Sequence, residues 1–127
     1  MIGTILGIVS KEMQNIDVPY EYMRWTSNVQ YPYWIGEYSE TTTDTEDGYN
    51  EYTLMVTGTT KGTWLELEEQ RAKIKDHFPQ IGGLRIATEK GVVVIFYENS
   101  FPVDTGEAEL KRIQINLHIK SWKGMND

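Results

Sequence analysis

The sequence predicts an α+β domain, in which a single, mostly antiparallel sheet of about five to six strands carries two packed helices and a projecting β-hairpin. Three observations support this prediction. Side chains over residues 49–60 alternate as in a strand, those over residues 63–78 repeat with the period of an amphipathic helix, and those over residues 112–120 alternate cleanly between polar and apolar. Because such a helix and such a sheet each have one apolar face, we expect them to pack together.

Length and composition are typical of one small protein domain. The chain has 127 residues, and domains commonly have about 100–150, so we expect a single domain over residues 1–127. Cysteine is absent from the sequence, which excludes disulfides and thiolate metal sites. The N-terminus is a poor match to a signal peptide, and no apolar run approaches the roughly 20 residues that span a bilayer. We therefore expect an intracellular, soluble chain with no membrane partner.

The charge balance argues against direct nucleic-acid binding. The formal net charge is −7, and the twelve basic residues are scattered along the chain. Neutralising phosphates requires clustered Lys and Arg. We therefore expect no nucleic-acid partner.

The N-terminal third predicts one helix followed by two strands. Apolar spacings of three and four residues predict a helix over residues 2–16, whereas residues 20–26 and 30–42 alternate as strands. Pro32 cannot donate a ladder hydrogen bond, so the second strand begins after it or lies at an edge. Gly36 indicates a bulge or the close approach of another backbone.

The polar segment over residues 43–48 predicts the loop of a long hairpin that continues into the strand over residues 49–60. Asp47-Gly48 is a typical turn pair, and the flanking threonines favour arms that project beyond the core. The segment does not fit a calcium loop. With Gly48 at the sixth position, threonines replace the first two acidic ligands and a leucine replaces the closing glutamate. A solvated turn and a weak site for a hard cation are the two alternatives.

Residues 63–78 predict a helix that begins with a capping box. Thr63 and Glu66 have the spacing of that motif. The apolar stripe of this helix consists of Trp64, Leu67, Ile74 and Phe78.

The C-terminal part predicts three more strands. Residues 84–88 and 91–97 form a hairpin, and the apolar run within the second of these strands predicts a central position in the sheet. Residues 98–106, which include Pro102, predict a loop. Residues 107–122 close the chain as a long strand with one buried and one wet face.

No pattern of residues indicates a reaction. Nothing pairs His77 or His118 with a nucleophile or with converging metal ligands. Carboxylate pairs at the separation used in glycoside hydrolysis arise by chance in a chain with many acids. The acids considered are Glu37, Glu40, Glu51, Glu66 and Glu98. We therefore expect no catalytic residue, no cofactor and no metal site, and we expect that the protein is not an enzyme.

Aromatic side chains are denser between residues 20 and 38 than a core of this size needs. Packing against the helices accounts for about half of them, and the others are suited to an amphipathic patch that binds a protein or a sugar. The set is Tyr20, Tyr22, Trp25, Tyr31, Tyr33, Trp34 and Tyr38.

Three segments, taken in order, carry a family resemblance. They are YPYWIGEYSE (Tyr31–Glu40), GTTKGTWLELEEQRAKIKDHF (Gly58–Phe78) and FYENSFPVDTGEAELKRIQINLHIKSW (Phe96–Trp122). Together they resemble small tail-assembly proteins of long-tailed bacteriophages and of prophages of Gram-positive bacteria, above all the tail-terminator (tail-completion) group. The resemblance covers most of the chain from Tyr31 onward, and the order of elements resembles the α+β fold of that family.

The resemblance implies a mechanical role in the virion. Such proteins form a ring, commonly a hexamer, that caps the tail tube, stops further tube subunits from adding and presents a surface to the head connector. The expected partners are therefore further copies of this chain, the phage tail tube protein and the head connector protein. We expect assembly in the cytoplasm of the bacterial host and a final location in the tail or neck of the virion.

A closed ring needs two different complementary patches on each subunit. The projecting hairpin and the aromatic side chains beside it are candidates, and an exposed edge strand can also extend a neighbour's sheet. The candidate interface residues are Tyr33, Trp34, Tyr38, Glu40, Asp44, Glu46, Asp47, Tyr49 and Glu51.

Other functions stay open at this point. The chain can be another neck or head–tail joining protein of a phage. It can also be a carbohydrate- or peptide-binding module that uses the aromatic patch. A small enzyme using the acids of the 43–48 loop is the third alternative.

Overall fold

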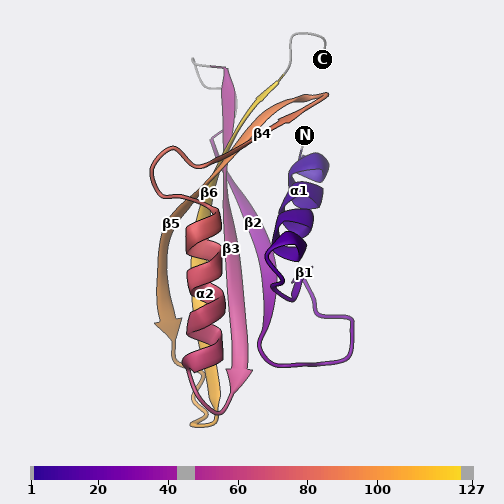
Figure 1. Cartoon of the computed structure of the whole chain (residues 1–127). Helices are drawn as coiled ribbons and strands as arrows, with labels where there is room; N and C mark the ends of the chain where they lie inside the picture. Colours follow the sequence, from indigo (N-terminus) through magenta and orange to yellow (C-terminus); the bar gives the residue numbers. More distant parts are fainter. Residues whose placement is uncertain (1, 43–47, 124–127) are drawn as a thin grey trace.

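The computed structural model describes residues 2–42 and 48–123. Over these residues the chain forms two helices and a single six-stranded sheet that curls as a half-barrel (Figure 1). The α+β prediction is therefore confirmed. In chain order the elements are α1 (Ile2–Asn15), β1 (Tyr20–Tyr22), β2 (Tyr33–Thr42), β3 (Tyr49–Lys61), α2 (Leu65–His77), β4 (Leu84–Thr88), β5 (Gly91–Val103) and β6 (Leu110–Lys123).

The sheet is mixed rather than purely antiparallel. Its strand order is β1-β2-β3-β6-β5-β4, and all neighbours are antiparallel except β1 and β2. The parallel pair is short, from Tyr20 opposite Trp34 to Tyr22 opposite Gly36. Because parallel neighbours cannot be joined by a tight turn, a wide loop over residues 23–32 connects them, and β2 begins just after Pro32, as predicted.

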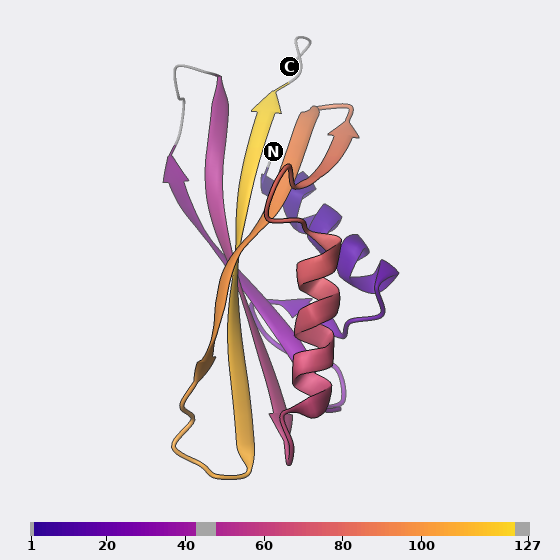
Figure 2. The same ribbon diagram turned by 60° about the vertical axis from the view of Figure 1, so that its left-hand side comes forward.

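Both helices cover the same face of the sheet (Figure 2). Alternate residues of β6 point at them, which confirms the predicted division of this strand into a buried and a wet face. The apolar side of α1 and the predicted stripe of α2, apart from Trp64, contribute to the same core. Fully or almost fully buried side chains include Ile5, Val9, Met13, Leu67, Ile74, Phe78, Ile113, Ile115, Leu117 and Ile119.

The start of α2 differs from the prediction. The helix begins at Leu65, with Trp64 at the N-cap position and no side-chain cap hydrogen bond, so the capping box of Thr63 does not form. A residue far away in sequence fixes the turn before this helix instead. The Gly62 N–H donates a hydrogen bond to the Glu109 carbonyl at 2.9 Å. Trp64 is 39% exposed and lies outside the apolar stripe that was predicted to include it.

Two strands have other lengths than predicted. β1 ends at Tyr22, because Met23 adopts a positive φ of 66° that no extended strand allows. β5 continues through the predicted loop over residues 98–106 as far as Val103. Pro102 is tolerated there because β4 pairs with β5 only as far as Ile95, so that the outer side of β5 is a sheet edge beyond it.

The predicted hairpin of β2 and β3 is present, but it does not stand free. Tyr49 to Tyr52 pair with Trp122 to Ile119, so β6 runs beside the whole described arm of β3. The hairpin is therefore continuous with the sheet, and its outer flank is formed by β2 alone.

Close contacts fix how β2 lies against its neighbours. The Trp34 ring is fully buried and lies on the backbone of its cross-strand partner Gly58, where an added Cβ would be 2.6 Å from three ring atoms. Gly36 likewise faces the Tyr20 ring. The close approach predicted at Gly36 is therefore made by a side chain rather than by another backbone.

We predict that Gly58→Ala lowers the free energy of unfolding by about 1–3 kcal/mol, because the new methyl group forces a buried indole out of position. Gly7→Ala is the matched control. No atom lies within 4 Å of a Cβ built there, and alanine in a helix interior stabilises by roughly 0.5–1 kcal/mol relative to glycine. Urea unfolding of both variants measures the difference. Equal effects at the two positions would contradict the packing described here.

Candidate functional site

The structure describes six of the nine predicted interface residues, and these six do not form one surface. Asp44, Glu46 and Asp47 lie outside the described residues. The other six lie in four separate surroundings: the core, a tyrosine row beside the helices, the opposite face of the sheet and the loop over residues 23–32.

Trp34 belongs to the core, and its assignment to a surface patch was wrong. Its side chain has no exposed area, and its indole Nε1 donates to the Gln70 Oε1 of α2 at 2.7 Å. The indole N–H is thus satisfied inside the protein, as buried tryptophans require. Because many aromatic residues lie close together in this part of the sequence, the sequence did not indicate which of their rings is buried.

Tyr38 is the exposed member of a tyrosine row on the helix-covered face of the sheet. It is 38% exposed, and its ring lies 6.3 Å from Tyr22 and 6.2 Å from the buried Tyr52, measured between centroids. Burial raises the pKa of Tyr52, and the nearby charge of Glu40 acts in the same direction. The phenol of Tyr52 therefore stays neutral at physiological pH.

The outer flank of β2 is an open sheet edge. β1 pairs with β2 only as far as Gly36, and in the described sheet no strand lies beside Glu37–Thr42 on that side. The Gly36 carbonyl accepts from the Met23 N–H, and the Trp34 N–H donates to the Pro19 carbonyl. Since backbone groups alternate along a strand, those of Tyr38 and Glu40 also point at this open edge.

The opposite margin of the sheet is formed by β4, a short strand paired on one side with β5. It carries the exposed Arg85. Figure 2 shows the β2–β3 arm and the β4–β5 hairpin at the same end of the molecule, on either side of β6. The two open edges therefore differ in sequence and lie on opposite flanks of one end of the sheet.

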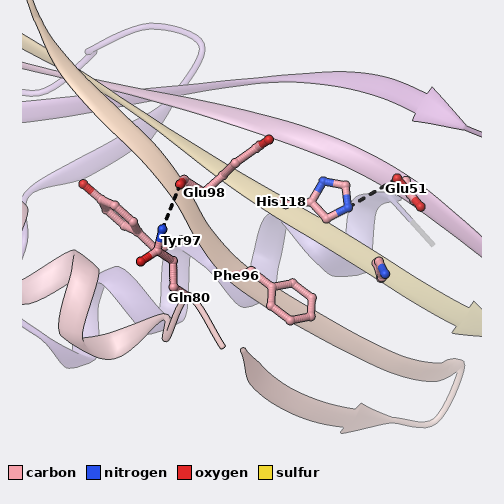
Figure 3. A pocket seen from close by; sticks show the side chains of 7 residues that line it. Glu51, Gln80, Phe96, Tyr97, Glu98 and His118 are labelled. Atoms are coloured by element: carbon pink, nitrogen blue, oxygen red, sulfur yellow. Dashed lines mark hydrogen bonds and ion pairs between the residues drawn. The ribbon is translucent and has the colours of Figure 1, made fainter. Parts of the chain in front are cut away.

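Tyr49 and Glu51 take part in a cluster on the face of the sheet that the helices leave uncovered. Glu51 Oε2 lies 3.3 Å from His118 Nε2 (Figure 3). The Lys120 ammonium lies 5.0 Å above the centre of the Tyr49 ring, and the Trp122 ring lies 5.4 Å from that of Tyr49. Strand register explains the grouping, since Tyr49 faces Trp122 and Glu51 faces Lys120.

A shallow hollow of about 430 Å³ adjoins this cluster. Its lining joins the sheet to the segment after α2, where Gln80 Nε2 donates to the Glu98 carbonyl at 3.2 Å (Figure 3). The lining residues are Glu51, Gln80, Phe96, Tyr97, Glu98, His118 and Lys120.

The cluster combines partly exposed charged and aromatic side chains. The contact between Glu51 and His118 is partly solvent-accessible, and accessible contacts of this kind contribute at most about 1 kcal/mol. No group of three or more potential metal ligands is found among the described residues. Sequence patterns missed Trp122, Lys120 and Phe96. Trp122 and Lys120 lie on the wet face of β6. Predicting that β6 pairs with β3 would therefore have placed both beside Tyr49 and Glu51.

The two histidines have different surroundings. His77 Nε2 lies 2.7 Å from Glu12 Oε1, so the end of α2 is tied to α1. The His118 ring lies beside that of Phe96, with 6.3 Å between ring centres and the two planes tilted by 43°. Both contacts are structural links between elements.

No protein-family model matches the chain, and no curated protein matches it either. Among the described helices, none is long and apolar enough to cross a bilayer.

We predict that Trp34→Ala lowers the free energy of unfolding by about 3–5 kcal/mol, as expected when a large core side chain is removed. Trp64→Ala is the control. Because Trp64 is 39% exposed, its removal should cost about 1 kcal/mol or less. Guanidinium unfolding followed by circular dichroism distinguishes the two. A similar, small loss for both variants would show that Trp34 is not a core residue.

Proposed function

We propose that this protein is a phage tail terminator, which forms a closed ring on the end of the tail tube and joins it to the head connector. The resemblance of three segments from Tyr31 onward motivates the family. The observation that carries the mechanism is the pair of unlike open edges, on β2 and on β4. A ring needs two different complementary patches on each subunit, and this sheet offers two at one end.

Backbone pairing between these edges is the proposed contact. The edge of one copy's β2 would add to the margin formed by β4 of the next, as in other cases of strand addition. Charge favours this pairing over self-pairing of either edge. Glu37 and Glu40 are exposed on β2, whereas β4 carries the exposed Arg85.

Tyr38 would anchor this contact. It is exposed, it sits on the edge strand, and its ring is held between two other tyrosines. Tyrosine and tryptophan are enriched at the centres of interfaces, because they bury a large area at a low cost in side-chain entropy. The neighbouring Glu40 would lie at the rim.

The cluster of Tyr49, Lys120 and Trp122 gives a second surface for a protein partner. It lies on the uncovered face of the sheet, away from both helices. We expect the tail tube protein and the head connector protein to bind surfaces outside the ring contact.

Removal of the gene from the phage or prophage that encodes it tests the proposed role. We predict tails of irregular, excessive length by electron microscopy, because tube subunits continue to add when no ring caps the tube. Restoring the wild-type gene should restore uniform tails. Tails of normal, uniform length in its absence would refute the terminator role.

A proline on the β2 edge tests the proposed contact. Glu40→Pro removes an N–H that points away from β3, so we predict a folded monomer, as proline is tolerated on edge strands. In phage lacking the gene, this variant should fail to restore uniform tail length. Glu40→Ala is the matched control, because it removes the same side chain but keeps the N–H, and it should restore assembly. Full complementation by the proline variant would exclude backbone pairing at this edge.

A further inference from the structure

A second hollow lies beside the start of β2, before the open edge of that strand begins. It has a volume of about 480 Å³ and opens between the C-terminal half of α1 and the loop over residues 23–32. Figure 1 shows this loop standing out from the body beside β1. The volume lies within the range of roughly 300–1,000 Å³ that small-ligand sites have.

The loop that forms one wall is held in place by its own hydrogen bonds. The Glu21 carboxylate accepts from the Thr26 hydroxyl at 2.6 Å and from the Thr26 N–H at 3.1 Å. It also accepts from the Ser27 N–H at 3.3 Å. These bonds, led by that of the Thr26 hydroxyl, hold the pKa of Glu21 below its usual value. Because these bonds order the wall before a ligand arrives, binding does not incur the entropic cost of ordering this loop.

Trp25 gives the hollow an aromatic wall that continues outward. Its indole N–H donates to the Asn28 carbonyl at 3.2 Å, which fixes the ring within the loop. The Trp25 ring lies 5.2 Å from that of Tyr33, which lies 5.7 Å from that of Tyr31. Three rings thus form a continuous row from the hollow to the surface, where Tyr31 is 39% exposed.

The polar part of the lining combines neutral amides and hydroxyls with two carboxylates, those of Asp17 and Glu21. Amides and hydroxyls each donate and accept hydrogen bonds, and here they surround an aromatic ring. The lining includes no Lys or Arg. The neutral amides and hydroxyls are those of Ser10, Gln14, Ser27, Asn28 and Gln30.

This combination selects one class of ligand. An anionic ligand meets two carboxylates and no cation in the lining. A simple cation would use the carboxylates, but that of Glu21 already accepts from Thr26 and Ser27, and the aromatic ring and the amides would stay unused. An apolar ligand would leave the amides without partners, which is costly when they are desolvated. A sugar has hydroxyls that both donate and accept, together with apolar C–H faces that pack on aromatic rings. We propose that this hollow binds a neutral oligosaccharide, with one unit against Trp25 and the next along Tyr33. The Tyr31 ring ends the row, because the Lys61 ammonium lies over it, 5.4 Å from its centre.

This binding site is separate from the proposed ring contact, so each proposal can fail alone. The hollow lies where β2 begins, near Tyr33, whereas the open edge begins after Gly36 and runs to Thr42. Binding can therefore be measured on isolated protein, whatever its role in tails.

The test uses the full chain labelled with ¹⁵N and three neutral probes, the tetrasaccharides of β-1,4-glucose, β-1,4-N-acetylglucosamine and α-1,4-glucose. At least one should shift the Trp25 indole signal and the amides of residues 25–30 in a saturable way. A sulfated heparin tetrasaccharide should not shift them. No shift with any neutral probe, or a stronger response to the sulfated one, would overturn the proposal.

Variants then locate the binding site. Trp25→Ala and Gln14→Ala should each weaken binding of the responding probe by about tenfold or more, whereas Trp25→Phe should retain most of the affinity. Trp64→Ala, which removes a partly exposed tryptophan elsewhere, should leave binding unchanged. Gln14 lies on the exposed side of α1, so its variant keeps the fold even if the loop of Trp25→Ala is altered. Wild-type affinity in the Gln14 and Trp25 variants would exclude this site.

Discussion

The long antiparallel ladder between β3 and β6 is the interaction on which the rest of this structure depends. It pairs the two strands without interruption from Tyr49 opposite Trp122 to Lys61 opposite Leu110. One side of this ladder supplies the apolar floor on which both helices pack. The other side places charged and aromatic side chains in a row, because the same register that aligns the core residues also aligns those between them.

Much of the fold follows from periodicity. The alternation of β6 and the stripe of α2 are strong patterns because each separates a buried face from a wet one. The structure confirms the first, and it confirms the second apart from Trp64. Patterns were weaker where long-range pairing decides the outcome. The extension of β5 past Pro102 depends on where its neighbour β4 stops, and no local pattern contains that information.

The candidate interface was harder to predict than the fold, for a related reason. Alternation assigns Trp34 and Tyr38 to the same face of β2 but does not say where the helices end. Trp34 lies beneath α2 and bonds to Gln70, whereas Tyr38 lies further along the strand and is exposed. Tyr49 and Glu51 were identified as surface residues, but their partners Trp122 and His118 are far away in sequence and become neighbours only through strand register.

The acidic character of the open β2 edge has a consequence for copies of the chain that meet in solution. Exposed strand edges readily join to identical edges, which leads to aggregates, and natural proteins often place charges there to prevent it. Two such edges brought together would crowd Glu37 and Glu40 of one molecule against those of the other. Like charges therefore disfavour the pairing of two β2 edges. The edge remains free to pair with a strand that lacks these acidic residues.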